Sequence, residues 1–143
     1  MDCEPLIPEP IVRLNRATIL LGAILAYVLH APLITTAIFV IVALAAAFGR
    51  RVSLIYRVGS FVFRTPFNPA QGEDPSLMRF NNALAAIILG AAQIAFVAHA
   101  PIIAWAFAGL AALAAAIALA GFCFGCFLFY QFKLNRSRIT RQA

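Results

Sequence analysis

The sequence predicts an all-α, polytopic membrane protein with four transmembrane helices, arranged as two helical hairpins, and one interfacial amphipathic helix. The first observation is composition: of the 143 residues, 64% are hydrophobic and 11% are charged, and the mean hydropathy is +0.94. A soluble domain would carry roughly a quarter charged residues, so this chain has too little polar surface to cover itself in water. The second is pattern, because the charges flank long uncharged runs that a His-Ala-Pro sequence interrupts twice.

The chain begins with a Pro-rich polar tail, residues 1–13, which carries acidic residues where a cleaved signal would be basic. We therefore expect the first span to remain in the mature protein. The membrane domain is residues 14–132, and residues 133–143 form a basic tail. Its four spans are expected at about 14–30, 32–49, 79–99 and 101–126.

The first two spans are short. Each uncharged run with its flanks covers about 25 Å at ~1.5 Å per residue, slightly less than a hydrocarbon core of ~30 Å. A tight turn would join them, with Pro32 at the first position of the second helix, where its missing N–H costs nothing. One long kinked helix is the alternative, although the two runs together would exceed the thickness of a bilayer.

Residues 50–64 predict an amphipathic helix that lies in the membrane interface. On a helical wheel, one side is apolar and the other carries arginines that we expect to face lipid phosphates: Arg50, Arg57 and Arg64. A continuation of the second span into a cytoplasmic cap is the alternative. The loop at 65–78 is rich in Pro, Asn and Gly, and its Glu73 and Asp74 are candidates to pair with Arg79.

Polar residues are few inside the predicted spans. Asn81, Asn82 and Gln93 are expected to form interhelical hydrogen bonds. Apart from Arg16 and Arg79, which open the first and third spans, no Asp, Glu, Lys or Arg lies within a span, which argues against ion or proton pumping. No Ser-His-Asp set or phosphate loop is present in the sequence, and no cofactor is expected. Aromatic residues expected in interfacial belts are Tyr27, Trp105 and Tyr130.

The two halves of the chain align at an offset of 69 residues. His30-Ala31-Pro32 matches His99-Ala100-Pro101, and an alanine-rich segment matches at the same offset. This register indicates a parallel repeat of a two-span unit, chance alignment of alanine-rich text being the alternative. His30 and His99 are either a paired metal or proton site or turn residues hydrogen-bonded to helix ends.

The basic residues define an orientation. All 11 lie on one side of the four-span arrangement, so the positive-inside rule predicts that both termini and the central loop are cytoplasmic. The net charge is +6, but the basic residues flank the apolar runs and are not arranged along one solvent-exposed face. This distribution argues against a nucleic-acid partner. The expected partner of this surface is the lipid bilayer.

Cys123 and Cys126 form a Cys-x-x-Cys pair where the last span leaves the membrane. If the helix continued, the two thiols would share one face, and Gly121 and Gly125 would form a small-xxx-small helix-packing surface. All three cysteines would face the reducing cytoplasm, where a structural disulfide is not expected. Near a helix C-terminus, the negative end of the helix dipole favours the protonated thiol over the thiolate. This position therefore argues against a reactive pair.

Three interpretations of the pair stay open. The thiols are a redox pair that cycles between dithiol and disulfide, or ligands of a soft metal ion, or small apolar residues in a packed interior. A different class of function is a non-catalytic accessory subunit, which packs its Ala- and Gly-rich faces against other membrane subunits or a second copy of itself.

Three separated motifs resemble a known family. They are Asn15-Arg16, Glu73-Asp74-Pro75 followed by Arg79-Phe80, and Gly121-Phe122-Cys123-Phe124-Gly125-Cys126. Together they resemble the small bacterial four-span membrane family catalogued as domain of unknown function 4395. The resemblance implies a bacterial inner membrane location. It also implies thiol redox or sulfur handling by Cys123 and Cys126, with a cytoplasmic thioredoxin-like or sulfurtransferase protein as partner. Cys3 lies outside these motifs.

Overall fold

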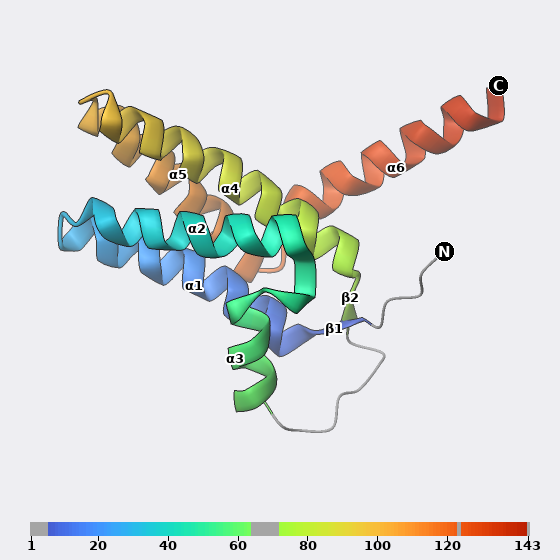
Figure 1. Ribbon diagram of the computed structural model, residues 1–143. Coiled ribbons are helices and arrows are strands. Elements are labelled where there is room, and N and C mark those ends of the chain that lie inside the picture. The colour runs from blue at the N-terminus through green and yellow to red at the C-terminus, as the bar shows by residue number, and fades with distance from the viewer. Residues whose placement is uncertain (1–5, 64–71, 123, 143) are drawn as a thin grey trace.

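The computed structural model describes residues 6–63, 72–122 and 124–142, and within them the chain is all-α apart from one two-residue β pair. This confirms the predicted fold class at the level of helix content (Figure 1). The elements in chain order are β1 (Ile7–Pro8), α1 (Glu9–Val28), α2 (Pro32–Phe48), the 3-10 turn η1 (Gly49–Arg51), α3 (Leu54–Val62), β2 (Gly72–Glu73), α4 (Pro75–Val97), α5 (Pro101–Leu119) and α6 (Phe124–Gln142).

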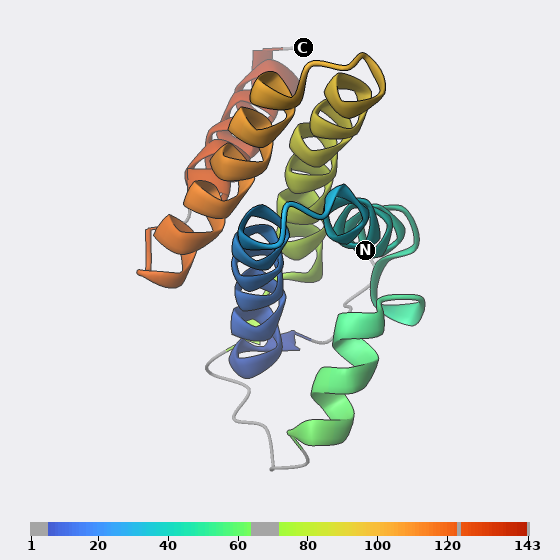
Figure 2. The same cartoon turned by 90° about the vertical axis from the view of Figure 1, so that its left-hand side faces the viewer.

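Three of these helices are long and apolar enough to cross a membrane: α1, α4 and α5. Helix α2 is equally apolar but has 17 residues. The four helices pack side by side, with α1 against α2 and α5, and α4 against α2 and α5 (Figures 1 and 2). All four contribute to the central cluster of buried side chains, which contains Ile19, Ile38, Val42, Leu89, Ala111 and Ala115. The chain is thus a membrane-protein fold of packed apolar helices.

The outer surface of these helices is apolar as well. Leu33 and Val97 are 80% exposed and Ile102 is 86% exposed, although each is a large hydrophobic side chain. In water such a surface would be unstable, whereas in a bilayer it faces hydrocarbon. Alanines and other small residues fill the contacts between the helices, as expected where close backbone approach replaces hydrophobic collapse.

The two His-Ala-Pro turns have the same structure. His30 and His99 adopt left-handed backbone conformations, with φ of 50° and 56°. The N–H of each histidine donates to the carbonyl three residues earlier, at 3.2 Å in both turns, and the following alanine donates to the carbonyl five residues earlier. This is the Schellman motif that ends α1 and α4, and Pro32 and Pro101 then begin the next helices. Both turns lie at the same end of the molecule (Figure 2), in the register expected of a repeat.

A polar contact joins α2 to α4 near this end. The side-chain amide of Gln93 donates to Thr35 Oγ1 at 3.1 Å, and Thr36 Oγ1 donates to Gln93 Oε1 at 2.8 Å. Thr35 is fully buried. The predicted interhelical role of Gln93 is therefore confirmed.

The segment after α2 is shorter and more irregular than the predicted helix over 50–64. Ser53 caps α3 by accepting a hydrogen bond from the N–H of Tyr56 at 3.2 Å. Ile55 and Gly59 are buried, and Gly59 lies close to Ile11 of α1. Arg57 is exposed, as predicted. The side chain of Arg50 and the whole of Arg64 lie outside the described residues.

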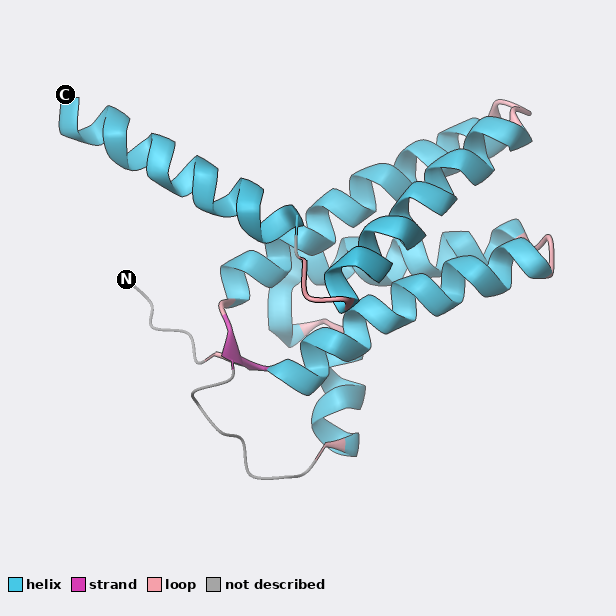
Figure 3. Ribbon diagram, turned by 180° about the vertical axis from the view of Figure 1, so that it is seen from behind, coloured by secondary structure: helices cyan, strands magenta, loops and turns pink. Residues whose placement is uncertain are grey.

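The last apolar run is divided between two helices, which corrects the expectation of one helix over 101–126. Helix α5 ends at Leu119, and a new helix, α6, begins at Phe124 and continues through the basic tail. The N–H of Gly121 donates to Ala118 O and that of Phe122 to Ile117 O, which is a third Schellman ending, with Gly121 at φ of 100°. Helix α6 projects away from the packed helices (Figures 1 and 3).

Candidate functional site

Polar residues cluster at the arginine-rich end of the molecule, next to the last turn of α5. The antiparallel pair β1–β2 places Glu73 opposite Ile7, next to the beginning of α1. There Arg16 Nη2 lies 2.8 Å from Glu73 Oε1, and the two side chains are only 17% and 19% exposed. A weaker contact of 3.4 Å joins Arg16 Nη1 to the carbonyl of Ala118. One arginine thus links the loop before α4 to the last turn of α5.

This contact positions the end of α5. The carbonyl of Ala118 also accepts the N–H of Gly121, so the guanidinium lies at the residues that end the helix. A cation at the negative end of a helix is favourable, and here a carboxylate holds it in place. Cys123 follows Ala118 by five residues in the sequence. Arg16 and Glu73 therefore hold the last turn of α5, which precedes the cysteine pair in the sequence.

The predicted pairing of Glu73 and Asp74 with Arg79 is wrong. Asp74 caps α4 by accepting the N–H of Ser76 at 2.8 Å. Arg79 donates to the carbonyls of Ala46 at 3.3 Å and Ala47 at 3.2 Å, and so caps the C-terminal end of α2. Asp74 and Arg79 thus each form hydrogen bonds with backbone groups at a helix end, because the terminal N–H and C=O groups have no partner within their own helix.

A buried amide pair lies beside Arg16. Asn15 and Asn82 are 4% and 2% exposed, and Asn15 Nδ2 donates to Asn82 Oδ1 at 2.7 Å. This confirms an interhelical role for Asn82, and its partner Asn15 was not predicted. The available signal was an Asn-Arg pair at the start of an apolar run, because polar residues at a span end often bond to another helix.

The cysteines lie mostly beyond what the structure describes. Cys3 and Cys123 are outside the described residues, and for Cys126 only the backbone is described. That backbone places Cys126 at the third position of α6, in its first turn. The predicted environment at a helix C-terminus is therefore wrong for Cys126. The first turn of a helix has unpaired N–H groups and the positive end of the helix dipole.

Gly121 and Gly125 do not lie on one helix. Gly121 belongs to the ending of α5, with no atom within 4 Å of the position that a Cβ would take, and Gly125 is the second residue of α6. The continuous small-xxx-small face expected from the sequence is therefore not formed. The positive φ of Gly121 explains the residue choice instead, since other residue types are strained in this conformation.

Helix α6 is held against α4 by aromatic residues. The rings of Phe80 and Phe129 are 5.9 Å apart, and Phe129 also contacts Tyr130 at 6.3 Å. Two of the three motifs that carry the family resemblance contact each other at this end of the molecule, through Arg16 and Glu73. Phe80 of the second motif contacts Phe129 of α6, the helix that begins within the third motif.

The histidines lie at the opposite end of the packed helices. The ring of His30 stacks on Tyr27 at 6.0 Å and lies 6.5 Å from Trp105. Within the described residues no group of three or more His, Cys, Asp or Glu side chains could hold a metal ion. Both histidines are residues of the helix-ending turns, as their backbone conformations and hydrogen bonds show.

A family model matches most of this chain, including the three motifs described above. The model of a family described as a domain of unknown function, DUF4395, matches residues 7–134. Neither curated proteins nor solved structures gave a match. The matched region contains α1 to α5 and the cysteine pair, and it covers nearly the whole chain. The chain therefore belongs to the family of domain of unknown function 4395.

Proposed function

We propose that the protein carries out thiol–disulfide or persulfide exchange through Cys123 and Cys126 at the cytoplasmic edge of the bacterial inner membrane. The observation that carries this proposal is the division of the last apolar run, which begins a new helix at Phe124 and puts Cys126 in its first turn. Helix N-termini stabilise thiolates, and the thiolate is the form that attacks sulfur. The basic residues of α6 add positive charge, since α6 carries four of them and no acidic residue.

For thiol–disulfide exchange, the only other reactant required is a partner protein that carries a disulfide. A thiolate of the pair attacks one sulfur of that disulfide, which forms a mixed disulfide and releases the partner's other sulfur as a thiolate. The second cysteine then attacks the mixed disulfide, so that two electrons pass to the partner and a Cys123–Cys126 disulfide forms. A dithiol protein, such as a reduced thioredoxin-like protein, restores the pair by the reverse steps.

The arrangement of the helices supports a cysteine pair that lies on the cytoplasmic side of the membrane, where a soluble partner protein reaches it. The described arginines at the ends of α1, α2 and α4 lie at the end where α6 begins, opposite to the two His-Ala-Pro turns. We infer four spans, α1, α2, α4 and α5, with this end in the cytoplasm. A cytoplasmic thioredoxin-like or sulfurtransferase protein is the partner that this placement favours.

The direct test is to trap the exchange intermediate. With Cys126→Ser or Cys123→Ser in the full-length protein, the attack still forms a mixed disulfide when the remaining cysteine is the nucleophile, but resolution is blocked. We expect one of the two variants to accumulate a partner that is released by dithiothreitol. Cys3→Ser is the matched control and should trap nothing beyond the wild-type level.

Two results would contradict the proposal. The first is a pair that alkylation shows to be fully reduced at all times in cells exposed to oxidants. The second is a double Cys→Ser variant that matches the wild type under oxidant and thiosulfate stress. Soft-metal binding is another role open to the thiols besides packing as small apolar residues, and metal analysis of the purified protein with intact thiols tests it.

An accessory role in a larger membrane complex is the second candidate, and one observation favours it. A cavity of about 290 Å³ lies between α1 and α5, open at the surface, and is lined mostly by small or aromatic residues: Ala23, Ile24, Tyr27, Trp105, Ala108, Gly109 and Ala112. No atom lies within 4 Å of the position that a Cβ of Gly109 would take. Such a surface fits a close-packed helix of another subunit. Purification in mild detergent as a free monomer would count against this role.

A further inference from the structure

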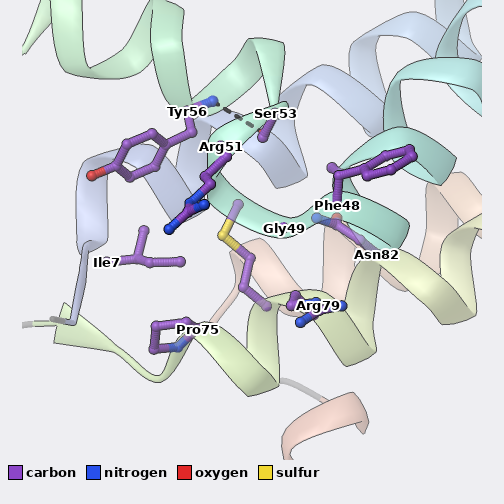
Figure 4. Close-up of a pocket in the computed structure, with 11 residues that line it drawn as sticks. Ile7, Phe48, Gly49, Arg51, Ser53, Tyr56, Pro75, Arg79 and Asn82 are labelled. Atoms are coloured by element: carbon purple, nitrogen blue, oxygen red, sulfur yellow. Dashed lines mark hydrogen bonds between the residues drawn. The ribbon is translucent and has the colours of Figure 1, made fainter. Parts of the chain in front are cut away.

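A second cavity at the arginine-rich end has features that neither thiol exchange nor helix packing explains. It has a volume of about 170 Å³ and lies between the end of α2, the start of α3 and the start of α4 (Figure 4). Its polar lining consists of Arg51, Ser53, Tyr56, Arg79 and Asn82, and its apolar lining includes Ile7, Phe48 and Met78. From this combination we propose that the cavity binds the anionic phosphate group of a lipid headgroup or of a soluble phosphate compound.

The charges around the cavity have one sign. Among the described residues, two guanidinium groups line it and no Asp or Glu does. Among the nearest acidic residues, Glu73 pairs with Arg16 and Asp74 caps α4. Arginine presents several N–H donors in a planar fork that matches the oxygens of a phosphate.

The two arginines differ in how many hydrogen bonds their guanidinium groups already make within the described residues. Arg79 donates through Nε and Nη2 to two carbonyls at the end of α2, so its position is fixed. Arg51 is exposed and makes no hydrogen bond or ion pair with the described residues. Figure 4 shows its guanidinium directed into the space above Ile7 and Pro75. Arg51 is therefore the donor that a bound anion would engage most fully.

A buried donor also faces this cavity. Asn82 is 2% exposed and lines the cavity, and its only hydrogen bond within the described chain is the one that its Oδ1 accepts from Asn15. Its Nδ2 group donates to no acceptor within the described residues and is not one of the fully enclosed polar atoms that lack a partner, so it is open to an anion in the cavity. An anion oxygen would satisfy it. The nearby N-terminus of α3, capped by Ser53, adds a favourable dipole.

The size of the cavity limits the ligand. At ~30 Å³ for each water in the liquid, 170 Å³ holds roughly five or six waters, enough for a phosphate with a few carbon atoms but not for an acyl chain. Phe48, 62% exposed, lies at the cavity and is available to contact a lipid tail outside it. A lipid source and a soluble source share the same phosphate chemistry, and experiment separates them.

The test uses full-length protein purified in a neutral detergent. Three probes are added: dioctanoyl phosphatidylglycerol, inorganic phosphate, and dioctanoylglycerol, which has the same tails and no phosphate. Binding is measured by native mass spectrometry and by the ligand-dependent rise in Tm. Wild-type protein should bind one or both phosphate probes in preference to dioctanoylglycerol. Binding of inorganic phosphate identifies a soluble source, and binding of the phospholipid alone identifies a lipid source.

Variants test the site itself. Arg51→Gln should weaken binding about tenfold or more, as expected for the loss of a charged hydrogen-bond donor. Arg57→Gln is the matched control, because Arg57 is exposed nearby on α3 but does not line the cavity, and it should change binding less than about twofold. Arg51→Lys, which keeps the charge and loses the fork, should give an intermediate affinity and serves as a second variant if Arg51→Gln does not fold. Equal losses in the Arg51→Gln and Arg57→Gln variants, or no preference of the wild type for phosphate, would overturn the proposal.

Discussion

Arg16 shows what a single charged residue does at the edge of this membrane domain. In the sequence it is marked only by its place at the start of a span and by the Asn15-Arg16 motif, yet it joins the loop before α4 to the end of α5. The sequence suggests Arg79 as the partner of Glu73, whereas the structure pairs Glu73 with Arg16. The correct pairing depends on the β1–β2 contact, which joins segments far apart in the chain.

Replacing Glu73 by Gln should destabilise the protein. Breaking a fully buried ion pair costs about 3–5 kcal/mol, and this pair is slightly exposed, so we expect the free energy of unfolding to fall by about 2 kcal/mol. The matched control is Glu9→Gln, which removes the same charge from the exposed pair with Arg13. There the expected loss is below about 0.5 kcal/mol. Thermal unfolding in detergent, followed by circular dichroism, measures both, and equal losses would show that the Arg16–Glu73 contact is not a structural one.

The helix endings explain most of the architecture at the scale of elements. Three helices, α1, α4 and α5, end in the same hydrogen-bond pattern, with His30, His99 and Gly121 in the left-handed conformation. Glycine is the usual residue there, and histidine has to adopt a less favourable backbone geometry. The turns at residues 30 and 99, which define the offset of 69 residues in the sequence, share one backbone conformation and hydrogen-bond pattern.

Substitutions at His99 separate a turn role from a ligand role. If His99 serves the turn alone, His99→Gly should keep the stability of the wild type or raise it by up to ~1 kcal/mol, because glycine adopts this conformation without strain. His99→Val should lower stability by more than about 1 kcal/mol, since a β-branched residue is strained there. The Tm values of the two variants in detergent give the order. A glycine variant less stable than the valine variant would show that the imidazole itself is required.

The break between α5 and α6 is the element that sequence reasoning placed least well. Apolar residues continue from Ile102 to Phe132, so periodicity and hydropathy give no boundary. Gly121 is the local signal, because glycine is common where a helix ends, but it is equally common where two helices pack closely. The structure uses it as a helix end, and this reverses the electrostatic environment expected for Cys126.

At the scale of the whole molecule, the sequence predicted the class of fold well. Composition and the uncharged runs predicted packed apolar helices, and the His-Ala-Pro turns lie where the repeat placed them. The polar contacts at the arginine-rich end could not be predicted, because the partners of Asn15, Arg16 and Arg79 come from other helices. The cysteine pair was recognised from its motif, but its position at the start of α6 depends on a helix break that hydropathy does not detect.

The measurement that tests the account most directly is the side of the membrane from which the cysteine pair can be labelled. A membrane-impermeant maleimide is applied to intact cells and to inverted membrane vesicles that contain the full-length protein with Cys3→Ser. The control is Ala31→Cys in a background without other cysteines, which places a thiol in the turn at the opposite end of the packed helices. We predict that Cys123 and Cys126 react in inverted vesicles only, and that the control cysteine reacts in intact cells. Labelling of Cys123 or Cys126 in intact cells would contradict the topology and the exchange with a cytoplasmic partner.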